Sequence, residues 1–408
     1  MSTPKSRKPS RGKPQKALGH FAQFSKAEFE QRIERARKVM TREKIDGLLV
    51  SSEVHLEYLS GFRSVFPWNS PSRPWYFFLP RVGDAVAVIP EFGATGWVRS
   101  SWCKSLATWP SPRPQDEGIT LLAGLIKGVK RRYGRFGVEL GPESRIGMPV
   151  GDLLRLRDAI RPIEMADCVG VLRELRLIKS PAEVARIRFL CQAACDAFDA
   201  LPGKIGAGDT ERDAMRAFQF EVMARGVDKA PFIMPRSGVD GVDALVAGPV
   251  ADKRLRKGEI LYMDQGSKHE GYFCDFNRNF TVGKATDKVR RAMALLYDST
   301  TAGIKAARPG ATAEDLFHAQ AKVLTDAGIV LGDIGRFGHG LGKNLTEPPS
   351  NMPGDRTRLV PGMVMTIEPS LMMGGDRILV REENLVITED GHRMLTRREP
   401  REVAELPA

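Results

Sequence analysis

Two aspartates end or interrupt apolar, strand-like segments in the second half of the chain. The run Ile260-Leu-Tyr-Met is followed directly by Asp264, and Asp275 comes eleven residues later within Tyr272-Phe-Cys-Asp-Phe-Asn-Arg278. A turn region of about seven residues would fold the second strand back beside the first and bring the two carboxylates face to face. Two buried carboxylates at close range repel each other unless a proton or a metal ion lies between them. The chain is therefore expected to fold into a strand pair that holds a cation.

Three further segments place a possible metal ligand in a similar setting. His339 lies between glycines in Phe337-Gly-His-Gly-Leu-Gly342, which leaves room for the imidazole to approach a bulky or multiply charged group. Glu368 ends an apolar run, and Glu382 lies at the start of another. Two aspartates, two glutamates and one histidine form a hard, oxygen-rich set that suits paired divalent ions such as Mn, Co, Fe or Zn.

Each of these residues also has an ordinary interpretation. A lone strand aspartate is more often a solvent-facing residue, and a lone histidine is more often a core or surface group with a satisfied hydrogen bond. Glu383 and Asp390 are interpreted in that ordinary way. Coincidence at all five positions is much less expected than at any one of them, so the five residues together predict a metal site.

Length and charge narrow the class of protein. The 408 residues exceed a typical domain, so two domains are expected, and 42% hydrophobic with 27% charged residues is typical of a soluble globular protein. Six of the twelve excess positive charges lie in residues 1–20, which hold no acid and are expected to be disordered. With half of the excess in a tail, no nucleic-acid partner is expected. No apolar run is long enough for a membrane span, so a cytoplasmic location is expected.

The five cysteines are far apart in the sequence, apart from Cys191 and Cys195, and form no CxxC pair, which argues against a disulfide framework and a structural zinc site. Cys191 and Cys195 lie four residues apart on an expected helix, where buried packing is the favoured interpretation.

Alternating patterns predict an α/β domain over residues 25–165 and an α+β domain over residues 172–400. In the first, a helix from Ser25 to near Gly47 precedes expected strands at 47–51, 75–79, 85–89 and 136–139 and a helix at 151–160. In the second, helices are expected from Ser180 to about residue 201 and from Thr210, Asp287 and Thr312, packed on one side of mostly antiparallel strands at 260–264, 272–282, 364–368 and 383–388.

Residues 172–400 resemble the methionine aminopeptidase, prolidase and creatinase superfamily, whose catalytic domain has the pita-bread fold. The family motifs are matched by Asp264, Asp275, His339, Glu368 and Glu382, and the register against Thr388-Glu-Asp-Gly391 selects Glu382 over Glu383. The first domain resembles the creatinase and prolidase N-terminal domain, notably at Tyr58-Leu-Ser-Gly-Phe62. The resemblance implies a pita-bread α+β catalytic domain preceded by a creatinase-like α/β domain, closest to the two-domain Xaa-Pro peptidases and creatinase-like members.

The resemblance also implies a mechanism. Asp275 and Glu382 would bridge two divalent ions, Asp264 would bind one ion, and His339 and Glu368 would bind the other. A shared water would attack a peptide or amide C–N bond, and Glu368 would accept and pass on its proton. The family further implies a short-peptide substrate, as for Xaa-Pro dipeptidase or aminopeptidase P, and a homodimer. In family dimers, the region that resembles residues 66–71 helps to wall off the partner's active site; ordinary loop packing is at least as well supported here.

Three departures leave the substrate open. Where family peptidases carry histidines for substrate contact and proton transfer, this chain has Ala247, Gly335 and Thr346. Threonine can donate a hydrogen bond but cannot carry a proton near neutral pH, so His55 and His269 are candidate substitutes, weighed against ordinary surface histidines. The alternatives are a creatinase-like enzyme that acts on a small non-peptide substrate, as a C–N hydrolase or lyase, and a non-catalytic binding scaffold.

Overall fold

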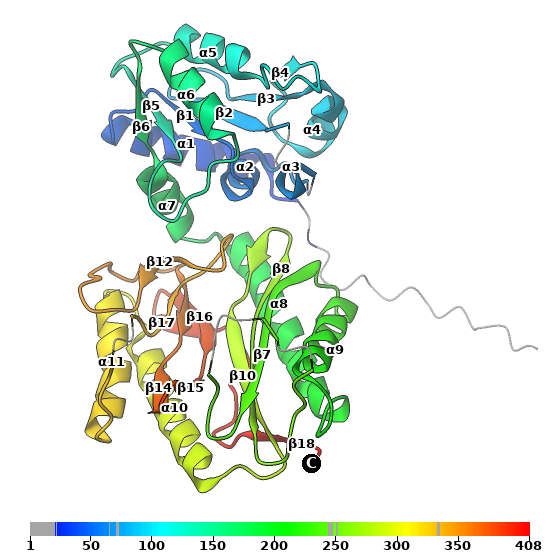
Figure 1. The fold of residues 1–408 in the computed structure, drawn as a ribbon. Coiled ribbons are helices and arrows are strands. Elements are labelled where there is room, and N and C mark those ends of the chain that lie inside the picture. The colour runs from blue at the N-terminus through cyan, green and yellow to red at the C-terminus, as the bar shows by residue number, and fades with distance from the viewer. Residues whose placement is uncertain are drawn as a thin grey trace, which may run out of the picture.

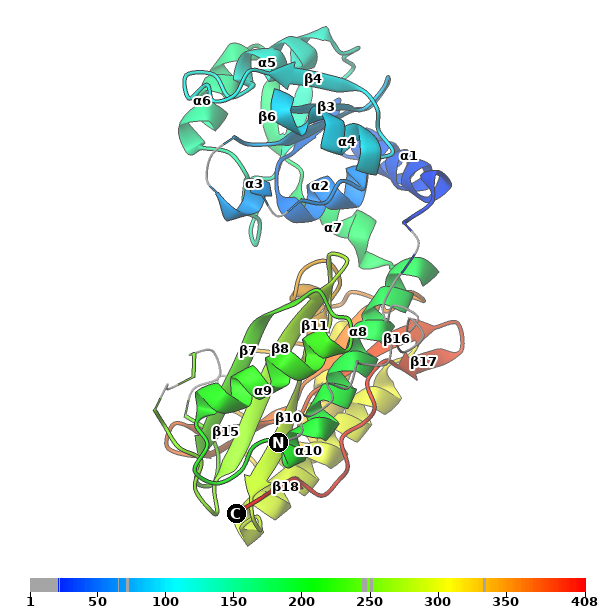
Figure 2. The ribbon, with the colours of Figure 1, turned by 90° about the vertical axis from the view of Figure 1, so that its right-hand side faces the viewer.

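The computed structural model describes residues 21, 23–64, 66–70, 73–243, 248–249, 252–332 and 335–408. They form two lobes that stand one above the other in both views of Figures 1 and 2. Helix α7 (Val169–Leu177) leads from the first lobe to helix α8 (Pro181–Ala200) of the second. The basic tail at 1–20 and Ala247 lie outside the described residues.

The first lobe is built on a six-stranded mixed sheet in the order β4-β3-β2-β1-β5-β6. Strand β1 pairs antiparallel with β2 and parallel with β5. Leu48 and Val50 of β1 pack into one core cluster, and Leu49 packs into another on the opposite face. Both faces of the sheet are therefore covered. The strands are β1 Gly47–Val50, β2 Tyr76–Pro80, β3 Val86–Pro90, β4 Leu106–Trp109, β5 Arg135–Val138 and β6 Glu164–Asp167.

The helices of this lobe are α1 Lys26–Arg42, α2 Glu53–Ser60, α3 Phe66–Asn69, η1 Glu91–Gly93, α4 Ala94–Ser100, α5 Ile119–Gly128 and α6 Val150–Ala159. Ser25 caps α1 as expected, with its hydroxyl accepting from the amide of Glu28. The helix ends at Arg42, before the predicted end near Gly47, because Lys44 has a φ of 58°, outside the helical range. Strand β1 opens at Gly47, where a side chain would collide with the ring of Phe136.

The second lobe contains two five-stranded sheets. One has the order β18-β10-β8-β7, with β9 on β8, and the other β12-β11-β13-β16-β17. All pairings are antiparallel except β10 with β18. The strands are β7 Lys229–Gly238, β8 Ile260–His269, β9 Tyr272–Phe273, β10 Phe276–Val282, β11 His339–Gly340, β12 Glu347–Ser350, β13 Val364–Ile367, β14 Ser370–Gly374, β15 Arg377–Val380, β16 Glu383–Thr388, β17 Gly391–Met394 and β18 Ala404–Leu406.

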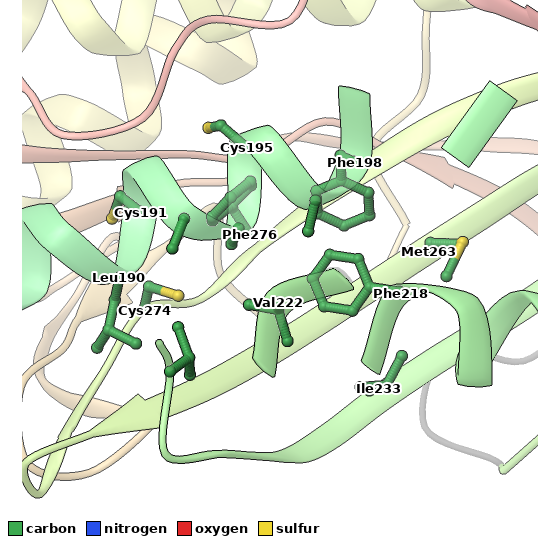
Figure 3. Close-up of a cluster of buried hydrophobic side chains, with 14 of the residues drawn as sticks. Leu190, Cys191, Cys195, Phe198, Phe218, Val222, Ile233, Met263, Cys274 and Phe276 are labelled. Atoms are coloured by element: carbon green, nitrogen blue, oxygen red, sulfur yellow. The ribbon is translucent and has the colours of Figure 1, made fainter. Parts of the chain in front are cut away.

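Helices η2 Leu201–Gly203, α9 Glu211–Ala224, α10 Asp287–Ala306 and α11 Ala313–Asp326 complete this lobe. The predicted helix starts are confirmed, because Ser180, Thr210 and Thr312 each form a full capping box. Figure 3 shows Cys191 and Cys195 of α8 in an apolar cluster that also includes Phe198 and Phe276, so these cysteines are buried packing residues, as expected. Among the described residues, no helix has the length and apolar character that a membrane span requires.

The hairpin that carries both aspartates differs from the prediction. Strand β8 continues to His269, and the turn consists of Glu270 and Gly271, with φ of 47° and 82°, instead of about seven residues. The register pairs Asp264 with Asn277, not with Asp275. Since side chains alternate along a strand, Asp275 still shares the face of Asp264 but lies diagonally from it. The prediction differed because polar residues interrupt the apolar pattern of β8, so the sequence did not reveal how far this strand pairs with β9 and β10.

Candidate metal centre

Four acidic side chains and one histidine gather where the two sheets of the second lobe meet. Atoms of Asp275, His339 and Glu382 that can bind a metal all lie within 4.8 Å of one another. His339 Nε2 is 3.5 Å from Asp275 Oδ2 and 3.8 Å from Glu368 Oε2. Asp264 lies on the neighbouring strand β8 and interacts electrostatically with the other three carboxyls. The structure therefore brings together all five residues that the sequence singled out.

The four carboxyls hold more negative charge than their surroundings neutralise. Burial raises the pKa of Asp264 to about 6, and burial followed by the charge of Asp264 raises the pKa of Glu368 to about 8. Burial and the neighbouring carboxylates also raise the pKa of Asp275 and Glu382 well above their usual values. A divalent cation among them would reverse these shifts.

His339 presents a lone pair to this negative group. Its Nδ1 lies 2.9 Å from the carbonyl oxygen of Gly340, which can only accept, so Nδ1 carries the proton and Nε2 is unprotonated. Burial, followed by the charge of Arg336, lowers the pKa of His339 to about 4 and keeps the ring neutral near pH 7. A nitrogen lone pair aimed at carboxylate oxygens is repulsive unless a cation lies between them.

Two carboxylate oxygens of the centre are buried without any hydrogen-bond donor among the described residues, namely Asp264 Oδ1 and Glu382 Oε1. Such an orphaned acceptor costs about 1–3 kcal/mol, more when charged. Oxygen donors with one imidazole nitrogen suit divalent ions such as Mn, Fe, Co and Zn. The orphaned oxygens, the exposed lone pair and the donor set thus fit a divalent-metal site.

Neighbouring polar residues fix the positions of the acids. Arg278 Nη1 donates to the backbone carbonyl of Glu382 at 2.9 Å, and its Nη2 donates to Glu383 Oε2 at 3.1 Å. Asn384 accepts from the backbone amide of Asp275 at 3.1 Å and donates to the carbonyl of the same residue. Glu383 is therefore occupied by Arg278, while Glu382 keeps its carboxylate for the centre.

The glycines beside His339 allow close contact with the backbone of neighbouring strands. The expectation that they make room for the imidazole is therefore corrected. Gly338 has a φ of 126°, and a Cβ there would collide with the carbonyl oxygen of Thr366 on β13. A Cβ on Gly340 would collide with the carbonyl oxygen of Pro348 on β12. The close approach also lets the His339 amide donate to Thr366 Oγ1 at 2.9 Å. The glycines thus let β11 fit tightly between its neighbours.

Two residues of the centre were not anticipated. Tyr262 is buried, and its side chain forms a hydrogen bond that opposes the burial-driven rise in the pKa of Asp264. Arg336 lowers the pKa of His339, after burial, and its charge opposes the rise at Asp275 and Glu368. Tyr262 could have been found from its spacing, since residues two apart on a strand share a face. Nothing in the sequence around Arg336 marks its proximity to the centre.

The remaining candidates are not among the five clustered residues. Thr346 is exposed, with its Oγ1 3.5 Å from Arg336 Nη2, and Gly335 is also exposed. His269 is not brought to the centre: it ends β8, five residues or roughly 17 Å along the strand from Asp264. Its Nδ1 lies 3.1 Å from Asp228 Oδ1 instead. Ala247 lies outside the described residues.

His55 lies in the first lobe, where its Nδ1 contacts Glu139. It lines a cavity of about 970 Å³ between the two lobes, together with Trp68 of α3 and Thr346 of the second lobe. Trp68, Asn69 and Ser70 thus line a cavity beside Thr346 of their own chain, while Pro71 lies outside the described residues.

The family models match both lobes. The model of metallopeptidase family M24 matches residues 185–390, which include all five clustered residues. The chain belongs to metallopeptidase family M24. The creatinase/prolidase N-terminal domain model matches residues 32–178. The predicted superfamily, the fold class and the metallohydrolase class are thereby confirmed, and membership of M24 implies a divalent metal cofactor.

Relatives align over nearly the whole chain. The Xaa-Pro dipeptidase of Lactobacillus delbrueckii subsp. lactis is 30% identical over 355 residues, which cover 86% of this chain and 93% of the relative. The Xaa-Pro dipeptidase of Pyrococcus furiosus is 26% identical over 377 residues, covering 91% and 99%. The crystal structure of dipeptidase PepE from Mycobacterium ulcerans superimposes with a TM-score of 0.80 at 26% identity and covers 95% of this chain and 100% of that one.

Proposed function

We propose that this M24 member is a dinuclear, metal-dependent peptidase that hydrolyses short Xaa-Pro peptides. The observation that carries the proposal is the buried group of four carboxyls and one neutral imidazole, with orphaned oxygens and a lone pair directed inwards. The dipeptidases among its relatives support the choice of substrate. The family alone supports one divalent cofactor, and the size of the acidic set supports two ions.

In this proposal, Asp264, Asp275, His339, Glu368 and Glu382 would hold the two ions. Mn, Co, Fe and Zn all suit this ligand set. Bound divalent ions supply a Lewis acid for the scissile carbonyl and lower the pKa of water.

Glu368 is the group that holds and moves a proton. Its side chain is 28% exposed, the most accessible of the carboxyls that lie near His339. It can therefore accept a proton from the attacking water and deliver it to the leaving nitrogen. His339 cannot take this role, because its Nδ1–H is held by Gly340 and its Nε2 faces the ligand cluster.

A second candidate follows from the loss of the family histidines. Thr346 and Gly335 stand where proton-carrying groups are expected, and neither can replace them near neutral pH. His55 shares a cavity with Thr346 and could contact the distal part of a substrate. This pattern favours a small non-peptide substrate with a C–N bond, in which Glu368 alone handles the proton.

A substrate panel tests the choice. The protein, reconstituted with Mn(II) and in parallel with Co, Fe and Zn, is assayed on Xaa-Pro dipeptides, Xaa-Pro tripeptides and small amides. Turnover of Xaa-Pro dipeptides near the enzyme median of about 10 s⁻¹ supports the peptidase. Turnover of small amides alone supports the second candidate. Metal-loaded protein that is inactive on every substrate contradicts both.

The proposal includes a division into an N-terminal domain at 25–165 and a catalytic domain at 172–400, a cytoplasmic location and a homodimer. Light scattering tests the dimer, and a monomer at assay concentration would remove it.

A further inference from the structure

A groove of about 730 Å³ lies between helix α8 and the strands β16 and β17 of the second lobe. Helix α8 lines one side through Ala185, Arg188 and Phe189, and the two strands line the other through Ile387 and Arg393. None of the five clustered residues of the metal centre belongs to this lining. The proposed reaction therefore gives the groove no role.

Two exposed arginines of the groove lack an acidic partner. Among the residues that the structure describes, no carboxylate lies within the 4.0 Å of Arg188 or Arg393 that an ion pair requires. The third cation of the lining, Lys179, is paired, with its Nζ 3.1 Å from Glu347 Oε2. The described lining contains no aspartate or glutamate, so its net charge is positive.

The basic tail is attached beside this groove. The first residue that the structure describes is Phe21, and its ring lies 5.8 Å from the ring of Phe189 in the groove lining. Residues 1–20, which precede it directly, carry six positive charges and no acid. Positive charge from distant parts of the sequence is therefore joined to one surface, and an anionic partner would be attracted to it.

The apolar part of the lining narrows the class of that partner. Pro181 and Ala185 are exposed there, so a bound apolar side chain would cover them. Phe189 is the only aromatic residue of the described lining, and its ring already contacts the rings of Phe21 and His269, at 5.8 and 4.9 Å. Single-stranded nucleic acids bind by stacking their bases on free aromatic rings, which this groove lacks among its described residues. Carboxylates with an apolar side chain between them match the lining better.

We propose that this groove docks an acidic segment of a partner protein, with carboxylates on Arg188 and Arg393 and an apolar side chain against Pro181 and Ala185. A guanidinium matches a carboxylate with two parallel hydrogen bonds, so the partner supplies the counter-charge that the described lining lacks. The positive surface disfavours basic partners, and the basic tail increases the rate of encounter with acidic ones. The competing occupants are a nucleic acid and a second copy of this chain.

Fluorescence anisotropy tests the docking surface with a short fluorescein-labelled peptide that alternates glutamate and leucine. The full-length protein should bind it equally well with and without metal, because the groove is separate from the centre. Arg188→Glu and Arg393→Glu should each weaken binding at least about tenfold, since each reverses a charge at the surface. Arg356→Glu is the matched control, because that arginine is 84% exposed on the same lobe and does not line the groove. No binding at about 0.5 mM protein, or an equal loss in the control, would overturn the proposal.

Matched probes separate the competing occupants without any use of peptidase activity. A peptide that alternates glutamate and serine should bind at least about threefold more weakly, because it lacks the apolar contact, and one that alternates lysine and leucine should not bind. Poly(U) that displaces the acidic peptide at a lower concentration than unlabelled peptide does would assign the surface to a nucleic acid and overturn the proposal. A lower oligomeric state of Arg188→Glu or Arg393→Glu in light scattering would assign the groove to a second copy and overturn it as well. The melting temperature of each variant establishes that it is folded.

Discussion

Glu347 and Glu368 are glutamates of the same lobe, 21 residues apart, and their carboxyls are shifted in opposite directions. Despite burial, the charges of Arg176 and Lys179 and the amide of Asn344 lower the pKa of Glu347 to about 2. Burial and the charge of Asp264 raise the pKa of Glu368 to about 8. The first carboxylate is matched by cations of the protein, and the second faces other acids.

The contrast separates structural from functional charge. Glu347 lies between the lobes, where Arg176 and Lys179 connect α7 to the second lobe, and its charge is fully used within the fold. Among the residues that the structure describes, no lysine or arginine forms an ion pair with Glu368, Asp264, Asp275 or Glu382, so the fold carries a local excess of negative charge. Burial alone therefore does not mark a functional acid, whereas burial without a cation does.

Removal of a ligand from the unmatched group should have the largest effect. Glu382→Gln takes away an acid that, by our proposal, would hold the ions, and we expect kcat/KM to fall by about 10³-fold or more. Glu389→Gln makes the same chemical change on an exposed turn of the same lobe and should keep full activity. Steady-state kinetics on the best substrate of the panel decide the point. A loss below tenfold would contradict the assignment.

Removal of the matched acid should instead cost stability. Glu347→Gln leaves the cations of Arg176 and Lys179 buried without a counter-charge, and we expect a loss of about 3–5 kcal/mol in the free energy of unfolding. Metal content should stay unchanged. In contrast, Glu368→Gln should stabilise the metal-free protein, because it relieves repulsion. Denaturant unfolding of both metal-free variants measures whether each substitution raises or lowers the free energy of unfolding. Changes in the same direction would contradict the comparison.

The pH dependence of the metal-free protein should follow the unmatched acids. The raised pKa of Glu368, about 8 against 4.5, gives stability that is present below pH 4.5 and lost as pH rises through 8. The lowered pKa of His339, about 4 against 6.5, acts only below pH 6.5. Between pH 6.5 and 8 the folded centre thus holds more protons than the unfolded chain.

Metal-free protein should therefore lose stability as the pH rises from 6.5 to 8, and Glu368→Gln should flatten this slope. Metal-loaded protein should show little change, because the ions replace the protons. Thermal unfolding at several pH values supplies the measurement. A wild-type slope no steeper than that of the variant would mean that Glu368 does not titrate in this range.

The smallest effect is expected from the basic tail. The ring of Phe21 lies 5.8 Å from that of Phe189 and beneath Arg186, so a deletion should spare Phe21. Removal of residues 1–20 should leave metal content and kcat/KM within about twofold. The reason is that the six excess positive charges of this segment, half of the twelve, belong to no residue of the metal centre. A larger loss would show that the tail contributes to activity.

Local signals predicted much of this fold. Helix starts were predicted at Ser180, Thr210 and Thr312, and each of these residues forms a capping box, which is a short-range interaction between a side chain and the first turn. Acids inside apolar strands identified the four clustered carboxyls, since an uncompensated carboxylate in a sheet is costly without a partner. His339 was identified from its position between glycines.

Contacts between residues that are far apart in the sequence could not be predicted in the same way. The register of β8 with β10 depends on the turn at Glu270 and Gly271, and the interrupted apolar pattern suggested a longer loop. Position 338 requires glycine because the backbone of Thr366, on another strand, leaves no room for a Cβ. Arg336 reads as an ordinary surface cation until the fold brings it to Thr346 and Ser350.

The central claim is that the unmatched acids form a two-ion centre, and metal stoichiometry tests it most directly. Protein reconstituted with Mn(II), freed of excess metal and analysed by mass spectrometry of the elements should hold about two ions per chain. Asp264→Asn and Glu382→Gln should each lower that content, and Glu389→Gln should not. Wild-type protein that retains no metal, or acid variants with undiminished content, would contradict the account.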